Sequence, residues 1–143
     1  ATDSPQVNFR GTQVSVIPLD AGPEIILAAA VPKDIWSLSG RGTSCPAATQ
    51  QVVRVTWTGG VRLPNRDELG DAQKSLYQVT VTSADGSQSQ VSPAALAELG
   101  DNDNNHFLCL DTTTPATAVA FPAGHLVDPN GDLNAASKVM VRR

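Results

Sequence analysis

Two cysteines and two histidines are the residues of this sequence whose chemistry is easiest to test by spacing. Cys45 and Cys109 lie far apart, and their spacing matches neither a CxxC redox motif nor a zinc knuckle. A reactive thiol needs a basic or histidine neighbour, and neither flank clearly supplies one. The pair therefore favours a disulfide, with two free buried thiols as the alternative. The bridge would close a loop of about 65 residues and contribute roughly 4 kcal/mol in the chain-entropy model.

The histidines, His106 and His125, could in principle serve a Ser–His–Asp arrangement. No G-x-S-x-G nucleophile elbow accompanies them, so we interpret both as surface or loop histidines. The acid pairs Asp67–Glu68 and Asp20/Glu24 could suggest glycoside hydrolysis, but the sequence gives no sign that two carboxylates converge on one sugar bond. We therefore predict that the protein is not an enzyme and that it uses no cofactor.

An acidic, amide-rich run offers oxygen ligands for a cation. Asp101, Asp103 and Asn105 match the first three ligand positions of a calcium loop. The match then fails, because His106 stands where an EF-hand needs glycine and Thr112 stands where it needs a bidentate glutamate. We predict no metal site, and keep calcium bound by this loop as the alternative.

Exposed aromatic and basic side chains are candidates for contacting a ligand. Trp57 lies on an alternating strand and is predicted to be core, whereas Trp36 is flanked by polar residues and suits an exposed contact. Arg41 lies in the glycine-rich segment 40–44, which could cradle an anion but lacks the spacing of a P-loop. The ligand-contact candidates are Trp36, Arg41, Asp101 and Asp103.

Composition limits the kinds of partner. The chain has 143 residues, which suits one domain over 1–143, and 41% of them are hydrophobic, which is enough to form a core. The net charge is −4 and the basic residues are scattered, so no basic stripe could neutralise nucleic-acid phosphates or an anionic membrane surface. The longest apolar run, 25–31, is far too short to span a bilayer.

The elements that must position these residues are mostly strands. Apolar residues alternate with polar ones in several short runs, and Asp85–Gly86 is typical of a type I′ turn that would join two of them into a hairpin. Gly59–Gly60 predicts a second such turn. The run 25–31 favours a buried strand, with a helix as the alternative. The predicted strands cover 25–31, 53–57, 61–63, 77–82, 87–91, 107–110, 117–121 and 138–142.

Helical signals are confined to two places. Ser92 fits an N-cap, Pro93 fits the first helical position and Gly100 fits the residue after the helix, so we predict a short helix between them. A second helical turn is predicted from Asn65, with Glu68 completing a capping-box pattern. Short strands separated by turns predict an all-β fold with these helices added, and more finely an antiparallel, immunoglobulin-like β-sandwich.

The N-terminal segment 6–14, Gln-Val-Asn-Phe-Arg-Gly-Thr-Gln-Val, resembles the N-terminal extension of chaperone–usher pilin subunits. The resemblance implies that alternate side chains of this segment fill the groove of a neighbouring subunit by strand addition. Cys45 lies farther downstream than the cysteine of many such pilins, and the terminal strand lacks their penultimate tyrosine. The strand-exchange candidates are Val7, Phe9, Gly11 and Val14.

The predicted function is therefore a non-enzymatic structural or adhesive subunit of an extracellular assembly such as a pilus. Its partners would be other protein subunits, copies of itself included, or a surface receptor. The alternatives are a carbohydrate- or receptor-binding module and a virion structural protein. A disulfide would imply an oxidising compartment, so we predict an extracellular or periplasmic location at the cell surface. Segment 1–16 would be an extension or an edge strand, and Ala1 would follow either a removed signal peptide or a removed Met.

Overall fold

The structure is a computed structural model that describes residues 22–32, 45–64, 71–97 and 104–143. Its strands are short, and the described part contains one six-residue 3-10 helix, η3 (Asp71–Leu76). The prediction of an all-β fold is confirmed. The strands are β1 (Ile25–Val31), β2 (Gln51–Trp57), β3 (Gln78–Thr82), β4 (Gln88–Val91), β5 (Ala95–Ala97), β6 (Asn105–Leu110), β7 (Ala116–Phe121) and β8 (Ser137–Arg142).

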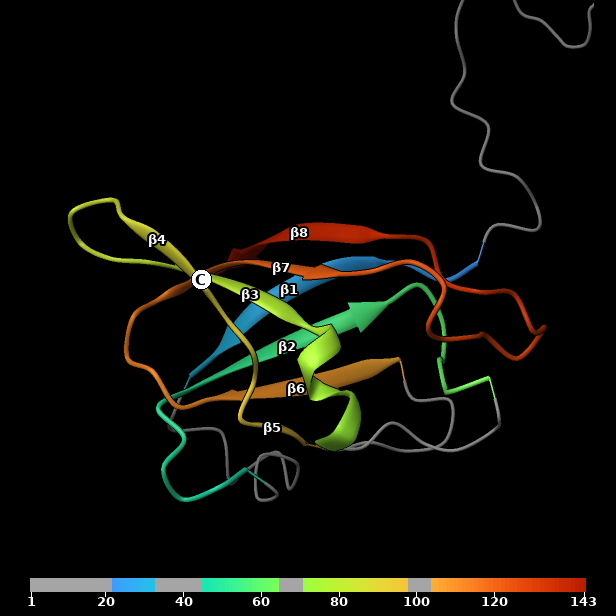
Figure 1. Ribbon diagram of the computed structural model, residues 1–143, viewed down its shortest axis with the longest axis horizontal. Helices are drawn as coiled ribbons and strands as arrows, with labels where there is room; N and C mark the ends of the chain where they lie inside the picture. The colour runs from blue at the N-terminus through green and yellow to red at the C-terminus, as the bar shows by residue number, and fades with distance from the viewer. Residues whose placement is uncertain (1–21, 33–44, 65–70, 98–103) are drawn as a thin grey trace, which may run out of the picture.

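These eight strands form one curled sheet in the order β4-β3-β7-β8-β1-β2-β6-β5 (Figure 1). Every adjacent pair is antiparallel except β1 and β8, which run parallel. The orders β1-β2-β6-β5 and β8-β7-β3-β4 match the A-B-E-D and G-F-C-C′ orders of an immunoglobulin-like sandwich. The β1–β8 pair joins the two halves into one sheet with mixed pairing, so the finer prediction of an antiparallel sandwich is not confirmed.

The main core lies inside the curl, where the two halves of the sheet face each other. Trp57 of β2 is completely buried there, which confirms its prediction as a core residue. Its ring meets the ring of Phe121 from β7 edge-on, with centroids 5.2 Å apart. Alternation explains this burial, because every second side chain of each strand points inward. The partly buried Val139 and Val141 of β8 pack against the same core.

A second, smaller cluster lies outside the curl, against the half of the sheet that contains β2, β5 and β6. The disulfide between Cys45 and Cys109 closes over it, which confirms the predicted bridge. The smaller cluster lies on the opposite face of the sheet from the main core, so the disulfide attaches residue 45 to that outer face. Its buried members are Val52, Ala95, Ala97, Phe107 and Cys109, with Val31 and Cys45 packed against them.

The predicted hairpin at 77–91 is confirmed as β3 and β4, but its turn differs from the predicted type. The N–H of Gly86 donates to the carbonyl of Ser83 at 2.9 Å, and the N–H of Ser83 donates to the carbonyl of Ser87 at 2.8 Å. Gly86 has a φ of 86°. This bonding gives a three-residue loop, in which a turn over Ser83–Gly86 ends in a glycine bulge, instead of a two-residue type I′ turn.

Two other local predictions are wrong. Residues 95–97 form strand β5 instead of the helix predicted between Ser92 and Gly100, because they pair with β6 and are buried in the smaller cluster. Gly59–Gly60 does not fold 61–63 back onto β2 as a hairpin strand. Arg62 instead forms an isolated bridge with Val127. The other predicted strands are confirmed, and the helical turn predicted from Asn65 lies outside the described residues.

Candidate functional site

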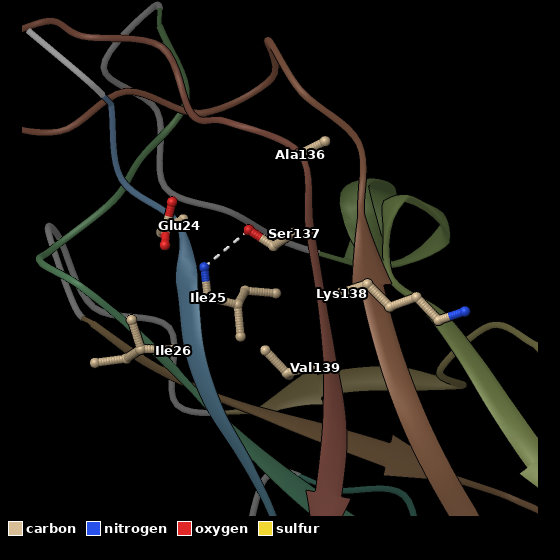
Figure 2. Close-up of a pocket in the computed structure, with 7 residues that line it drawn as sticks. All are labelled: Glu24, Ile25, Ile26, Ala136, Ser137, Lys138 and Val139. Atoms are coloured by element: carbon tan, nitrogen blue, oxygen red, sulfur yellow. Dashed lines mark hydrogen bonds between the residues drawn. The ribbon is translucent and has the colours of Figure 1, made fainter. Parts of the chain in front are cut away.

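A groove opens where β1 and β8 begin. Its volume is about 420 Å³, and the two strands line its opposite sides. Figure 2 shows Ile25 of β1 pointing across the groove toward Val139 of β8, while Ile26 points to the other side of its strand. The lining residues are Glu24, Ile25, Ile26, Ala136, Ser137, Lys138 and Val139.

The groove exists because the two strands pair over a very short length. Their parallel register covers only two residue pairs, Ala28 with Val141 and Ala29 with Arg142. At the open end the N–H of Ile25 donates to the hydroxyl of Ser137 at 2.9 Å, so a side chain occupies the place of a main-chain partner there. The register of β1 against β2 also shifts between Ile25 and Leu27, as at a β-bulge.

The groove joins an apolar floor to a polar rim. Ile25 is buried in the main core and Val139 is partly buried against it, so the floor reaches the core itself. Ile26 is 56% exposed beside the groove. Glu24 lies at the mouth of the groove, whereas the Lys138 side chain extends away from β1, past the far side of β8 (Figure 2). The groove therefore offers both apolar side chains and polar groups to whatever occupies it.

The chain enters this groove end through a tight backbone contact. A Cβ at Gly22 would lie 1.6 Å from the carbonyl oxygen of Leu133, so only glycine fits. Just beyond it, the N–H of Ala135 donates to the carbonyl of Pro23 at 3.1 Å. These contacts hold Gly22 and Pro23 at the same end of the molecule as the groove mouth at Glu24.

A second hollow of about 480 Å³ lies beside the turn 128–131, where Gly131 has a φ of 86°. Arg62, Pro64 and Leu133 border it, and none of the described residues that line it is aromatic. Asp128 is occupied with the turn itself, because its carboxylate accepts from the N–H groups of residues 130 and 132. The described part of this lining therefore offers no aromatic face of the kind that a sugar platform needs.

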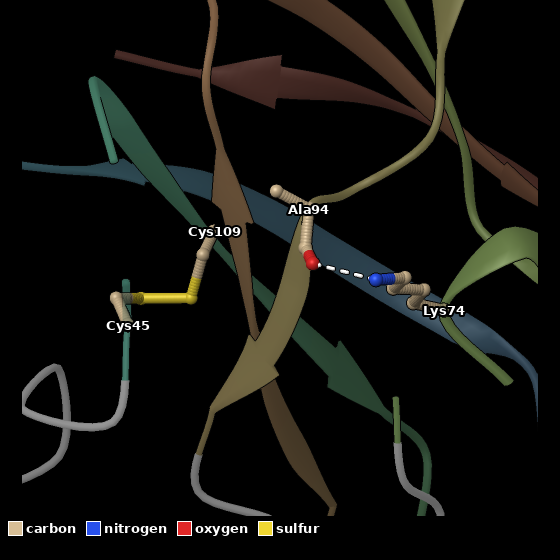
Figure 3. Close-up of a disulfide and its surroundings, with 4 residues drawn as sticks. All are labelled: Cys45, Lys74, Ala94 and Cys109. Atoms are coloured by element: carbon tan, nitrogen blue, oxygen red, sulfur yellow. Dashed lines mark hydrogen bonds between the residues drawn. A yellow bond between two sulfur atoms is a disulfide. The ribbon is translucent and has the colours of Figure 1, made fainter. Parts of the chain in front are cut away.

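The disulfide lies away from the groove, on the β6 strand (Figure 3). The Cα atoms of Cys45 and Cys109 are 5.7 Å apart, within the usual range for a bridge. Nearby, the ammonium of Lys74 in η3 donates to the carbonyl of Ala94 at 2.8 Å. These contacts fasten η3 and the segment before β5, and they bring no reactive group to the surface.

The prediction that His106 lies on the surface or in a loop is wrong. It lies on β6 with 1% of its surface exposed, and its Nδ1 lies 2.5 Å from the hydroxyl oxygen of Tyr77. That hydroxyl accepts from Nε1 of Trp57 at 2.9 Å, so its own hydrogen can be donated to a neutral His106. Burial raises the pKa of the Tyr77 phenol far above its ordinary value. His125, by contrast, is exposed in a loop as predicted.

This buried triad is a structural network. All three side chains are enclosed in the core, and the rings of Tyr77 and Phe121 meet edge-on at 4.8 Å. The hydrogen bonds satisfy polar atoms that would otherwise be costly to bury.

Most of the predicted contact residues lie outside the described part of the chain. Both cysteines are described and bonded. The groove residues Ile25, Ser137 and Val139 were not predicted as a site, because only the strand order places residues 25 and 137 side by side. The predicted residues outside the described ranges are Val7, Phe9, Gly11, Val14, Trp36, Arg41, Asp101 and Asp103.

Within the described ranges, no group of three or more His, Cys, Asp or Glu side chains is arranged to hold a metal ion. None of the helical residues described here belongs to a helix with the length and hydropathy needed to cross a bilayer.

Comparison of the chain with protein-family models, with curated proteins and with solved structures finds no match.

Proposed function

We propose that this protein is a non-enzymatic structural or adhesive subunit of an extracellular assembly such as a pilus, and that subunits join by strand addition at the β1–β8 groove. One observation carries the proposal. The two strands pair over two residue pairs only and leave a groove whose floor includes the core residue Ile25 and the partly buried Val139. The N-terminal segment 6–14 of a neighbouring copy is the proposed occupant.

The composition of that segment suits the groove. Val7 and Phe9 share one face of an extended chain and would cover the apolar floor formed by Ile25 and Val139. Arg10 carries the one charge between residues 6 and 14, and Glu24 at the groove mouth has the opposite sign. Main-chain hydrogen bonds to β1 or β8 would add affinity that depends little on sequence.

The length of the groove sets a limit on this pairing. Beyond Leu27 the strands pair directly, so a donor longer than a few residues must separate Ala28 from Val141 and Ala29 from Arg142. Each main-chain hydrogen bond contributes only about 1 kcal/mol net. Breaking the few bonds of so short a ladder therefore costs little free energy if the donor strand replaces them. The disulfide supports the proposed location, since such bonds persist in oxidising compartments.

The test uses the full chain, a deletion of residues 1–16, and a synthetic peptide of residues 4–16. We expect the deletion to abolish assembly while leaving a domain that binds the peptide, with chemical-shift changes at Ile25 and Val139. A peptide carrying Phe9→Asp should bind at least about tenfold more weakly, because a carboxylate would enter an apolar floor. Assembly that continues unchanged after the deletion would refute the proposal.

A matched pair of variants tests the position of the contact. Ala136 is exposed and lines the groove, whereas the neighbouring Ala135 is exposed and does not. We expect Ala136→Trp to block both peptide binding and assembly, and Ala135→Trp to leave both intact. Equal effects of the two substitutions would place the contact elsewhere.

A further inference from the structure

The free edge of the sheet at β4 is a second surface with a definite chemistry. β4 is the first strand in the sheet order, so β3 pairs with it on one side only. Gln88, Ser89 and Gln90 are all exposed, and the turn before β4 projects away from the sheet (Figure 1). The opposite edge strand, β5, is entirely buried, so the main-chain edge that is open to a partner is that of β4.

The direction of the main-chain groups on this edge follows from the hairpin. Ser83 and Ser87 form a hydrogen-bonded pair, and such pairs alternate with non-bonded ones along an antiparallel ladder. Thr82, which lies opposite Gln88, donates its N–H to Pro115 on the far side of β3. Gln88 and, two residues on, Gln90 therefore direct their N–H and C=O groups away from β3, toward the open edge.

The sequence of this edge is self-complementary. It reads Gln-Ser-Gln about Ser89, so an antiparallel pair of two β4 strands centred on Ser89 sets Gln88 of one copy opposite Gln90 of the other. These are the residues whose main-chain groups point outward, and the pair would form about four main-chain hydrogen bonds. The two Ser89 side chains meet at the close, non-bonded position, where small side chains fit best.

Charge does not oppose this pairing. The strand carries no ionisable side chain, whereas edges that avoid partners usually carry lysine or proline. Asp85 is the nearest carboxylate, and in this register it would lie opposite residue 93 of the other copy, far from the second Asp85. We propose that β4 pairs with β4 of a second copy about a two-fold axis centred on Ser89, which continues the sheet from one molecule into the next.

The experiment measures association of the full chain by sedimentation velocity between about 10 µM and 1 mM, the range in which a small interface is informative. We expect a concentration-dependent dimer. Ser89→Lys and Ser89→Glu should each raise the dissociation constant at least about tenfold, because like charges meet at the axis. Gln78→Lys, an exposed substitution on the neighbouring strand and away from the edge, is the matched control and should leave the dimer unchanged.

Mixing the two charged variants identifies the register. Lysine at position 89 of one copy then faces glutamate at position 89 of the other, so an equimolar mixture should recover a dimer at least as tight as the unmodified chain forms. Association through the β1–β8 groove would not respond to charge at residue 89, which separates this interface from the proposed function. The proposal is wrong if the chain stays monomeric up to 1 mM, or if the mixture fails to recover the dimer.

Folding of the variants is checked separately. Ser89 is exposed, so we expect both charged variants to keep the far-ultraviolet circular dichroism of the unmodified chain. Gln90→Pro is a second way to weaken the dimer without charge, because it removes a main-chain N–H that points to the open edge and does not bond to β3. A dimer that survives this substitution and both charge changes would overturn the assignment.

Discussion

Nδ1 of His106 on β6 and the hydroxyl oxygen of Tyr77, which lies between η3 and β3, are 2.5 Å apart inside the curled sheet. Trp57 donates to the same hydroxyl, so Tyr77 links three elements through one oxygen atom. Because all three side chains are buried, each hydrogen bond protects a group that water cannot reach.

The first prediction concerns alkaline pH. Burial raises the pKa of Tyr77, so the folded protein holds this proton more tightly than the unfolded chain. The resulting stability is complete below the ordinary tyrosine pKa near 10, and is lost as the pH rises above it. The chain has a single tyrosine, so tyrosinate absorbance reports this group alone. We expect absorbance to rise together with unfolding, and a titration near pH 10 in the folded state would contradict the burial.

The second prediction removes the hydroxyl. Tyr77→Phe leaves the N–H of Trp57 and Nδ1 of His106 without this partner, and should lower the free energy of unfolding by about 2–4 kcal/mol. Thr117→Val is the control, because it also deletes one bonded hydroxyl but at a partly buried site, and should cost less than about 1 kcal/mol. Urea denaturation measures both, and equal losses would argue against a special role for the buried network.

The third prediction concerns the bridge between Cys45 and Cys109. Replacing both cysteines with alanine should lower the free energy of unfolding by about 4 kcal/mol, the value expected for a loop of this length. Intact mass should rise by about 2 Da on reduction of the unmodified protein. Hydrogen exchange should accelerate at Val52 and Phe107 of the smaller cluster more than at Val79 and Val119 of the main core. Uniform acceleration would show that the two clusters are not separable.

The fourth prediction compares two glycines. Gly22→Ala forces a methyl group onto the backbone at Leu133 and should cost roughly 1–3 kcal/mol. Gly59→Ala meets nothing within 4 Å and serves as the control. Thermal unfolding of the two variants checks the difference. Equal stability would mean that the segment at Gly22 does not approach Leu133 as closely as the structure has it.

The fifth prediction concerns Asp85 in the β3–β4 turn. The hydroxyl and N–H of Ser87 both donate to its carboxylate, at 2.7 Å and 3.0 Å, and hold its pKa below the ordinary value. Its contribution to hairpin stability is therefore present above the unfolded pKa and is lost as the pH falls through the folded one. A carboxyl titration by NMR should show the lowered pKa, and Ser87→Ala should raise it. No change in that variant would exclude Ser87 as the cause.

Local signals in the sequence located much of the fold. The alternation at 77–91 with a glycine in the turn predicts the β3–β4 hairpin, because both the partner and the turn lie within a few residues. The helix predicted from Ser92 fails for the opposite reason. Its capping residues are local, whereas Ala95 and Ala97 take their conformation from pairing with Cys109 and Phe107 on β6. Tertiary contacts override so short a propensity signal.

The candidate site could not be read from the sequence at all. The groove depends on Ile25 meeting Ser137, a contact across 112 residues that only the sheet order creates. His106 shows the same limit, because its burial depends on Tyr77 29 residues away. Composition and periodicity predict which side chains point inward, but they carry no information on which distant strand lies alongside.

The parallel run of β1 and β8 sets how the molecule would carry a mechanical load. Gly22 precedes the start of β1 and Arg143 follows the end of β8, so a pull applied at these two residues acts along the strands in opposite directions. The short ladder at Ala28–Ala29 would then be sheared as a unit, with its bonds strained together instead of one after another. A force applied between Gly22 and Arg143 would therefore be resisted first by this short ladder.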